Sequence, residues 1–219
     1  MLLADRILFI DAEALVIDKP AGLPVDQPKD GSLSVDAHLE SLRFSFKRRP
    51  STVHRLDRDT SGCLLLARSD RSHKRYQQAF EAGEISKTYL AVLDGVTEGD
   101  SGTIELALSK ISSKADGWRM IPARAGKAAV TDWTLLTTHN GLSLIKFEPR
   151  TGRTHQLRVH AASGLGAPVA GDPVYGRPGG KHMLLHAARL IVPREGKDAI
   201  DVSSPLPPHF PDWARDAIG

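Results

Sequence analysis

One stretch of this sequence, residues 54–67, joins a dense polar segment to an apolar run and so limits the folds that the chain can adopt. The polar segment reads His-Arg-Leu-Asp-Arg-Asp-Thr-Ser-Gly, and the apolar run that follows reads Cys-Leu-Leu-Leu-Ala. The apolar run is typical of a buried strand, and the polar segment is typical of a loop. A loop braced by a buried strand can hold a carboxylate rigidly while its side chain stays exposed, as catalysis requires. The stretch therefore predicts a candidate catalytic loop at the start of a core strand.

Asp57 is the candidate catalytic carboxylate of this loop. Arg55 and Arg58 flank it, and their positive charges favour its ionised form. A salt-bridged loop ahead of a core strand accounts for the same residue types equally well. The residues of this stretch alone leave both interpretations open.

Further segments of the chain match one protein family, in the order that the family shows. They are Lys19–Val25, Lys87–Val92, Arg150–His160, Gly171–Gly176 and Leu184–Ala187. Together with residues 54–62 they resemble the motifs of the RNA pseudouridine synthases, in the branch of the large-subunit synthase A. The resemblance spans residues 15–207, nearly the whole chain. Asp26 departs from it, because many relatives carry a histidine after the valine of the first motif.

The resemblance implies an α+β fold, the pseudouridine synthase catalytic fold, with a mixed, mostly antiparallel central sheet flanked by helices and loops. It implies a single catalytic domain over residues 1–219, without the S4 domain that many relatives carry at the N-terminus. A chain of 219 residues with 41% hydrophobic and 25% charged residues is ordinary for one globular domain.

Apolar periodicity and turn residues predict the individual elements. Strands are expected over residues 7–10, 15–17, 87–93, 130–136, 142–147 and 183–192, and helices over residues 34–42 and 70–82. Asn140–Gly141 is a type I′ turn signal and predicts a hairpin. Ser34 is the expected cap of the first helix, and Ser69 or Asp70 that of the second. Residues 154–162 fit a helix or a strand, and the resemblance favours the helix.

The resemblance gives three residues a role in the reaction. Asp57 matches the catalytic aspartate. Arg158 matches the basic residue that forms a salt bridge with that aspartate, which would keep the carboxylate ionised and oriented. Tyr89 matches the tyrosine that stacks on the uracil, and its hydroxyl is a candidate for proton transfer at C5. Without the surrounding motif, Tyr89 would be interpreted as a core residue of a strand.

The resemblance also implies that the target base leaves its stack before it reacts. Arg55 matches the arginine that enters the space vacated by the base. Leu185 matches the aliphatic residue that lies under the flipped base. Leu184 is the alternative at that position, and a core role explains either leucine without any contact to RNA.

The reaction breaks the C1′–N1 bond of uridine, rotates the uracil and rejoins it through C5. We expect no cofactor, because atoms and electrons balance without a redox partner. The reaction calls for one carboxylate, which acts either at C6 of the base or at C1′ of the ribose. A second acid is not needed, so Asp59 is assigned to ion pairing within the loop.

The histidines and the cysteine do not predict a metal site. His155 and His160 are five positions apart and His182 and His186 four, but no His-Glu-x-x-His motif or cysteine pair accompanies them. Cys63 is the only cysteine and lies in the apolar run, which predicts a buried structural thiol.

The expected partner is RNA, as a stem-loop of ribosomal or transfer RNA. The net charge is only +3, but basic residues cluster in segments that could form a positive face for phosphates. These segments are residues 47–49, 68–75, 119–127 and 150–158. Any single cluster is more typical of solvated surface charge. The sequence holds no targeting signal or long apolar run, so we expect a cytoplasmic monomer without a membrane partner.

Two alternatives compete with an RNA pseudouridine synthase. The first is a catalytically idle RNA-binding or ribosome-assembly factor on the same fold, for which Asp57, Tyr89 and Arg158 together would be unnecessary. The second is a carboxylate-dependent hydrolase of a nucleoside or glycoside. That hydrolase would release free base and would need a second catalytic acid, and the sequence offers no clear candidate for one.

Overall fold

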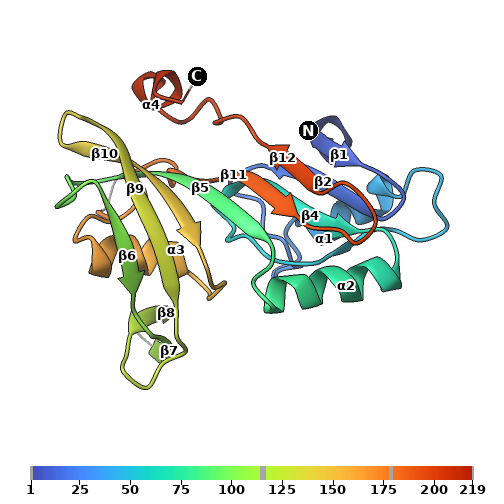
Figure 1. Ribbon diagram of the computed structural model, residues 1–219, viewed down its shortest axis with the longest axis horizontal. Helices are drawn as coiled ribbons and strands as arrows, with labels where there is room; N and C mark the ends of the chain where they lie inside the picture. Colours follow the sequence, from blue (N-terminus) through green and yellow to red (C-terminus); the bar gives the residue numbers. More distant parts are fainter. Residues whose placement is uncertain (1, 114–116, 178–179, 219) are drawn as a thin grey trace. The chain divides into compact units, whose positions relative to one another are not determined.

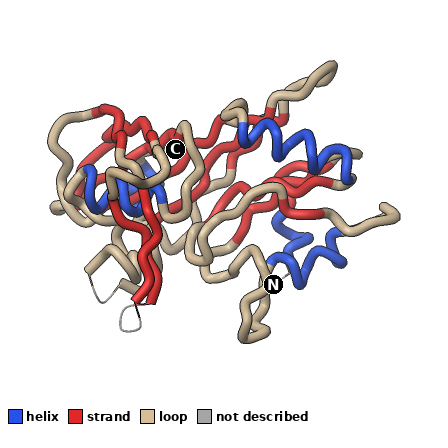
Figure 2. The backbone as a smooth tube through the Cα atoms, turned by 90° about the horizontal axis from the view of Figure 1, so that it is seen from below, coloured by secondary structure: helices blue, strands red, loops and turns tan. Residues whose placement is uncertain are grey.

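The chain forms two compact units that are built on β-strands and a few short helices (Figures 1 and 2). The computed structural model describes residues 2–113, 117–177 and 180–218. Unit 1 comprises Met1–Lys87 and His186–Leu206, and unit 2 comprises Thr88–Leu185 and Pro207–Gly219. The single catalytic domain over residues 1–219 that is expected from the sequence stays a prediction.

The sheet of unit 1 has the strand order β1, β2, β4 and β11, with β3 beside β4 and β12 beside β11. The bounds are β1 Ile7–Ile10, β2 Ala14–Lys19, β3 Ser51–Thr52, β4 Ser61–Ala67, β11 Leu185–Val192 and β12 Ile200–Ser203. Strands β4 and β11 run parallel, and the other neighbours in this unit run antiparallel. The prediction of a mixed, mostly antiparallel sheet is therefore confirmed.

Strand β4 is the core strand of unit 1, as the apolar run predicts. All seven of its residues are buried. Successive side chains of a strand point to opposite faces, so both faces of the sheet are covered at this strand. Helix α2 (Asp70–Glu81) lies alongside this strand (Figure 1). Tyr76 and Ala79 of the helix pack in one buried cluster with Cys63 and Leu65.

The helices of unit 1 begin where their caps predict. Ser34 accepts a hydrogen bond from the backbone N–H of Ala37, and α1 (Val35–His38) continues as the 3₁₀ turn η2 (Leu39–Leu42). Ser69 and Ser72 form a capping box at the start of α2. A further 3₁₀ turn, η1 (Leu3–Arg6), precedes β1.

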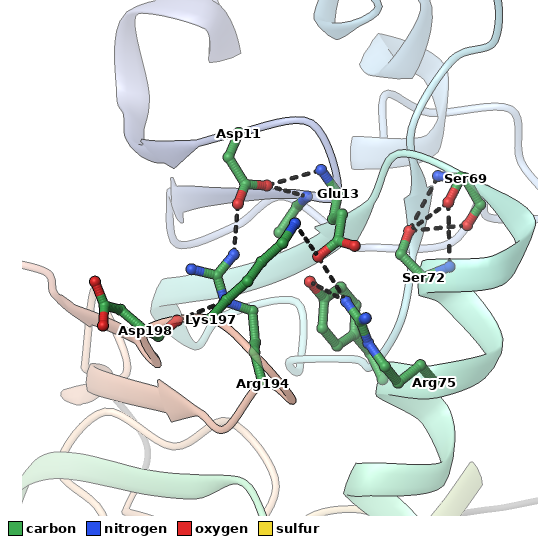
Figure 3. Close-up of polar contacts among 10 residues, drawn as sticks. Asp11, Glu13, Ser69, Ser72, Arg75, Arg194, Lys197 and Asp198 are labelled. Carbon is green, nitrogen blue, oxygen red and sulfur yellow. Dashed lines mark hydrogen bonds and ion pairs between the residues drawn. The ribbon is translucent and has the colours of Figure 1, made fainter.

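Two acidic residues of the β1–β2 turn form hydrogen bonds and ion pairs that connect neighbouring elements of unit 1 (Figure 3). Asp11 accepts the backbone N–H of Glu13 at 2.8 Å and pairs with Arg194 in the β11–β12 connection. Glu13 pairs with Arg75 of α2 at 2.8 Å and with Lys197 at 3.2 Å. The charge of Arg75, part of one basic cluster of the sequence, therefore takes part in the fold.

The larger sheet of unit 2 has the strand order β5, β10, β9 and β6, and β7 pairs with β8 in a separate hairpin. The bounds are β5 Ser86–Leu93, β6 Ser101–Glu105, β7 Leu108–Ser113, β8 Gly117–Pro122, β9 Val130–His139 and β10 Leu142–Pro149. Helix α3 (Gln156–Val159) runs into a π-helical turn, η3 (His160–Gly164), and α4 spans Asp212–Asp216. Leu157 of α3 joins Leu93 and Phe147 of the sheet in one buried cluster.

The hairpin around Asn140–Gly141 is confirmed. Both residues have positive φ, 49° and 78°, as a type I′ turn requires. The two strands are longer than predicted and run to His139 and Pro149. A register shift between Leu144 and Ile145 leaves Leu136 of β9 as the extra residue of a bulge.

Other predicted elements differ from the structure at their ends. The strand expected over residues 183–192 begins at Leu185. The helix expected over residues 154–162 begins at Gln156, because His155 has a φ of 52° and cannot belong to a right-handed helix. None of the helices within the described residues is both long and apolar enough to cross a membrane.

Gly62 allows β4 to approach β11. Its φ is 106°, and it pairs with Ala187 in the parallel ladder. A Cβ atom on Gly62 would lie 2.2 Å from the carbonyl oxygen of Ala187, closer than any real contact. Only glycine satisfies both the backbone angle and the contact with the neighbouring strand.

We expect Gly62→Ala to lower the free energy of unfolding by about 3 kcal/mol, because a backbone carbonyl cannot yield to the new methyl group. The measurement is urea denaturation followed by far-ultraviolet circular dichroism. Gly141→Ala is the matched control, since Gly141 also has positive φ but no atom within 4 Å of the added Cβ. Its cost should be that of the backbone angle alone, about 1–2 kcal/mol. Equal costs for the two variants would contradict the close approach.

Candidate active site

The loop that carries Asp57 joins β3 to β4 and has a fixed backbone. Leu56 is buried at 7% exposure, and Thr60 at the far end of the loop is buried at 2%. The backbone N–H of Thr60 donates to the carbonyl oxygen of Asp57 at 3.2 Å and closes a tight turn. Asp57 itself is half-buried. The loop thus presents one partly accessible carboxylate from a rigid turn.

Lys19, at the end of β2, lies beneath this loop and is completely buried. Its Nζ donates to the carbonyl oxygens of Pro20 at 2.9 Å, Leu23 at 2.8 Å and Arg58 at 2.9 Å. The first two carbonyls belong to the loop after β2, and the third belongs to the Asp57 loop. One side chain therefore ties the first sequence motif to the second.

Two opposing effects set the pKa of Lys19. Burial lowers the pKa of Lys19 to about 7, and the carboxylates of Asp59, Asp57 and Asp18 oppose this effect. Donation to three carbonyls uses all three N–H groups of an ammonium, so the geometry is that of the protonated form. A positive charge is thus buried next to the candidate catalytic carboxylate.

Two arginines of the Asp57 loop also reach the loop after β2. Arg58 donates from Nε to the carbonyl oxygen of Gly22 at 3.2 Å. Arg55 pairs with Asp26 at 3.0 Å, and both side chains are largely exposed. Asp26 is the position where the sequence departs from the family pattern. An exposed ion pair of this kind is weak, so Arg55 can exchange Asp26 for another anion at low cost.

His54, the first residue of the motif, is a structural residue of unit 1. Its Nε2 accepts the backbone N–H of Leu65 at 2.9 Å, and its ring stacks on Phe80 with 4.5 Å between centroids. Burial, aided by the charge of Lys87, lowers the pKa of His54 to about 3. The imidazole is therefore neutral at physiological pH and braces the loop against β4.

Arg158 of α3 forms a buried, bidentate ion pair with Asp172. Nε and Nη2 of Arg158 donate to the two carboxylate oxygens, each at 2.7 Å, and the side chains are only 5% and 0% exposed. Burial alone would raise the pKa of Asp172. Arg158 and the backbone N–H groups of Val174 and Tyr175 outweigh burial and hold the pKa of Asp172 below its usual value. The pair fixes the plane of the Arg158 guanidinium.

Tyr89 and Leu185 are both associated with the core of unit 2. Leu185 is 3% exposed and belongs to the same buried cluster as Phe147 and Leu157. Tyr89 of β5 is half-buried and packs against that cluster. Both residues therefore contribute to the core, which is the alternative that the sequence leaves open for each. Their contacts with a uracil stay predictions.

The five residues singled out from the sequence divide between the two units. Asp57 and Arg55 share one loop of unit 1. Tyr89, Arg158 and Leu185 belong to unit 2, where they lie on β5, on α3 and at the start of β11. Arg158 and Leu185 are held by short hydrogen bonds or by core packing, whereas Arg55 is largely exposed.

Comparison with known proteins identifies the family. The family model described as RNA pseudouridylate synthase matches residues 13–163, more than half of the chain. The chain belongs to the RNA pseudouridine synthase family. An RNA pseudouridine synthase of Zymomonas mobilis, named as uncharacterized, is 55% identical over 214 residues, which cover 96% of this synthase and 98% of that protein.

Other relatives agree with this assignment. Ribosomal large subunit pseudouridine synthase C of Rickettsia felis is 36% identical over 218 residues, which cover 95% of this synthase and 70% of the relative. A solved structure titled human RNA pseudouridylate synthase domain containing 4 superposes with a TM-score of 0.81 at 25% identity, covering 99% of this chain and 94% of that one. The predicted fold, the branch of the family and the isomerase activity are therefore confirmed.

Two residues that hold this synthase's candidate site received no role from the sequence. Lys19 and Asp172 both lie in segments that match family motifs, and that match was the available signal. A lysine at the end of a strand and an aspartate before a proline are ordinary surface residues by type. Their burial appears only when residues distant in sequence enclose them.

Cys63 is buried, as predicted, and burial raises the pKa of its thiol to about 12. Among the described residues, no group of three or more His, Cys, Asp and Glu side chains has the arrangement of a metal site.

We expect the stability of the synthase to fall in acid because of His54. Its pKa is lowered from 6.5 to about 3 on folding, so between these values the unfolded chain binds a proton that the folded chain excludes. The free energy of unfolding should therefore drop by about 2 kcal/mol from pH 6.5 to pH 5. Urea titrations across this range measure it.

His54→Gln keeps an acceptor for Leu65 but cannot titrate, so its stability should depend less on pH. The exposed His139, changed to Gln, is the matched control and should keep the wild-type dependence. The same acid slope in His54→Gln and in the wild type would contradict a neutral His54 in the folded chain.

Asp172→Asn should lower the free energy of unfolding by about 3 kcal/mol, because it removes a carboxylate from a buried guanidinium. Asp201→Asn is the control. Asp201 also pairs with an arginine, Arg189, at 2.6 Å, but these side chains are 47% and 50% exposed. The exposed pair should contribute less than about 1 kcal/mol. Similar losses of unfolding free energy in the two variants would contradict the larger contribution expected of the buried Arg158–Asp172 pair.

Proposed function

We propose that this synthase isomerises a uridine in a stem-loop of ribosomal or transfer RNA, with Asp57 as the catalytic carboxylate. The observation that carries the proposal is the position of Asp57 in a tight turn that leads into the core strand β4 and is hydrogen-bonded by the buried ammonium of Lys19. These contacts restrict the carboxylate while leaving it partly accessible. An ordinary salt-bridged surface loop would need neither constraint.

The buried amino group of Lys19 interacts electrostatically with the carboxylate of Asp57. Asp57 acts at C6 of the base or at C1′ of the ribose while the C1′–N1 bond breaks. The uracil then rotates, C5 bonds to C1′ and Asp57 is released, while the C5 proton passes to solvent and N1 takes up a proton in its place. Atoms and electrons balance within the uridine, so the reaction as proposed uses no cofactor.

Arg158 and Tyr89 complete the proposed catalytic group. Arg158 supplies the positive charge that keeps Asp57 ionised and oriented, and the Asp172 pair presets the plane of its guanidinium. Tyr89 stacks on the uracil, and its hydroxyl assists proton transfer at C5. Its half-buried position on β5 supports this role, because one part of the side chain is anchored in the core while the rest stays accessible.

Arg55 and Leu185 are proposed to act when the base flips out of its stack. Arg55 leaves its exposed pair with Asp26 and enters the vacated space. Leu185 lies under the flipped base. The weak pairing of Arg55 supports the first role, since little energy is needed to release the side chain.

Ribosomal RNA is supported as a substrate by the relatives named ribosomal large subunit pseudouridine synthase C. The protein would then work in the cytoplasm as a monomer, with both units forming one catalytic domain. RNA is held by its phosphates through basic residues, and the loop sequence is recognised through unpaired bases.

The test is the release of tritium from RNA labelled at C5 of uridine, in mixed ribosomal and transfer RNA. Asp57→Asn should reduce release by about 10⁴-fold or more, as loss of a catalytic residue does in other enzymes. The variant should still bind RNA, because it removes a negative charge.

Asp59→Asn is the matched control, because it removes a carboxylate of the same loop that also interacts with Lys19. It should keep most of the activity. Equal loss in both variants would mean that the loop needs its charge balance and that Asp57 has no special role. Release of free uracil would support a hydrolase instead.

A further inference from the structure

Trp118 on β8 is a large aromatic side chain that the fold leaves exposed. It is 45% exposed, whereas Trp133 on β9 is buried at 6%. Single exposed apolar residues are common, so exposure alone indicates nothing. The surroundings of Trp118 separate it from an ordinary surface residue.

A cation and a second ring flank the indole. The ammonium of Lys110, on the neighbouring strand β7, lies 4.8 Å from the centroid of the Trp118 ring. The ring of His155 lies 4.8 Å from the indole on centroids, tilted by 31°. His155 has a φ of 52°, a backbone conformation that non-glycine residues adopt at a cost and that often occurs at functional sites.

These contacts continue inward to Arg158. The Tyr175 hydroxyl lies 3.0 Å from Nδ1 of His155 and accepts the backbone N–H of Met120 at 2.9 Å. The Tyr175 ring lies 5.2 Å from the guanidinium carbon of Arg158. A continuous series of rings and cations therefore runs, within unit 2, from an exposed indole to a buried residue of the proposed catalytic group.

The segment that carries Trp118 is also basic. The sequence of residues 106–128 includes five basic residues, Lys110, Lys114, Arg119, Arg124 and Lys127, and a single acidic residue, Asp116. Cations beside an exposed aromatic ring form the combination that binds single-stranded nucleic acid, because phosphates meet the charges and bases stack on the ring.

We propose that Trp118 is a stacking platform for an unpaired base of the RNA loop that contains the target uridine, and that Lys110 contacts the adjacent phosphate. This inference rests on the proposed function and deepens it, because it names the feature by which the enzyme distinguishes a loop from a duplex. Bases in a loop can turn outward onto an aromatic ring, whereas bases in a duplex are already stacked and paired.

The test compares binding of a uridine-rich RNA hairpin with binding of a blunt duplex that has the same stem. Trp118→Leu keeps an apolar cover over His155 but has no aromatic face, and it should weaken hairpin binding by about 5- to 150-fold. Trp118→Phe should restore most of this loss. Duplex binding should stay within twofold in both variants.

Trp213→Leu is the matched control. Trp213 also stacks on a histidine, His139, at 5.3 Å between centroids, but no cation contact accompanies it in the described residues, and hairpin binding should not change. The proposal is overturned if Trp118→Leu binds the hairpin within twofold of the wild type, or if it loses hairpin and duplex binding equally. Thermal unfolding of each variant establishes that it is folded.

Binding is measured in the Asp57→Asn background, where turnover should be about 10⁴-fold slower, so the outcome does not depend on activity. If the protein with Asp57 releases tritium but Trp118→Leu does not weaken hairpin binding, the stacking platform is overturned and the isomerase stays in place. If Trp118→Leu weakens hairpin binding but the protein with Asp57 releases no tritium, the proposed reaction is overturned and the platform stays in place.

Discussion

The buried ammonium of Lys19 is the interaction on which the geometry around Asp57 depends. Burying an amino group is costly unless hydrogen bonds replace its water, and Lys19 replaces it with three backbone carbonyls from two loops. Pro20, Leu23 and Arg58 all lie outside the strands, so no ladder hydrogen bond satisfies these carbonyls. One side chain therefore satisfies both loops and also brings a positive charge near Asp57 and Asp59.

Three charged or titratable groups of the synthase reach the interior by different means. Lys19 is held by carbonyl oxygens, Arg158 by the carboxylate of Asp172, and His54 by becoming neutral. Each solution restricts motion, since hydrogen bonds in a buried site are directional and costly to break. The polar residues next to the proposed chemistry are thereby more rigid than exposed loops of the same composition would be.

Local signals in the sequence predicted the elements that depend on few neighbours. The Asn140–Gly141 turn needs only two residues with positive φ, and the cap of α2 needs only Ser69 and the residues after it. Element ends were less predictable. The start of α3 depends on the left-handed backbone of His155, and tertiary contacts at that residue outweigh the helical tendency of its segment.

The sequence by itself determined the family, the core strand after the Asp57 loop and the candidate catalytic residue, because these rest on contiguous motifs and on an uninterrupted apolar run. Only the tertiary structure decided that Lys19, His54 and Asp172 hold the polar residues in place. Lys19 lies 39 positions from Arg58, and Ser61 lies 125 from its partner His186. Residue type does not reveal such burial, because a lysine or an aspartate is buried only when distant parts of the chain supply its hydrogen bonds.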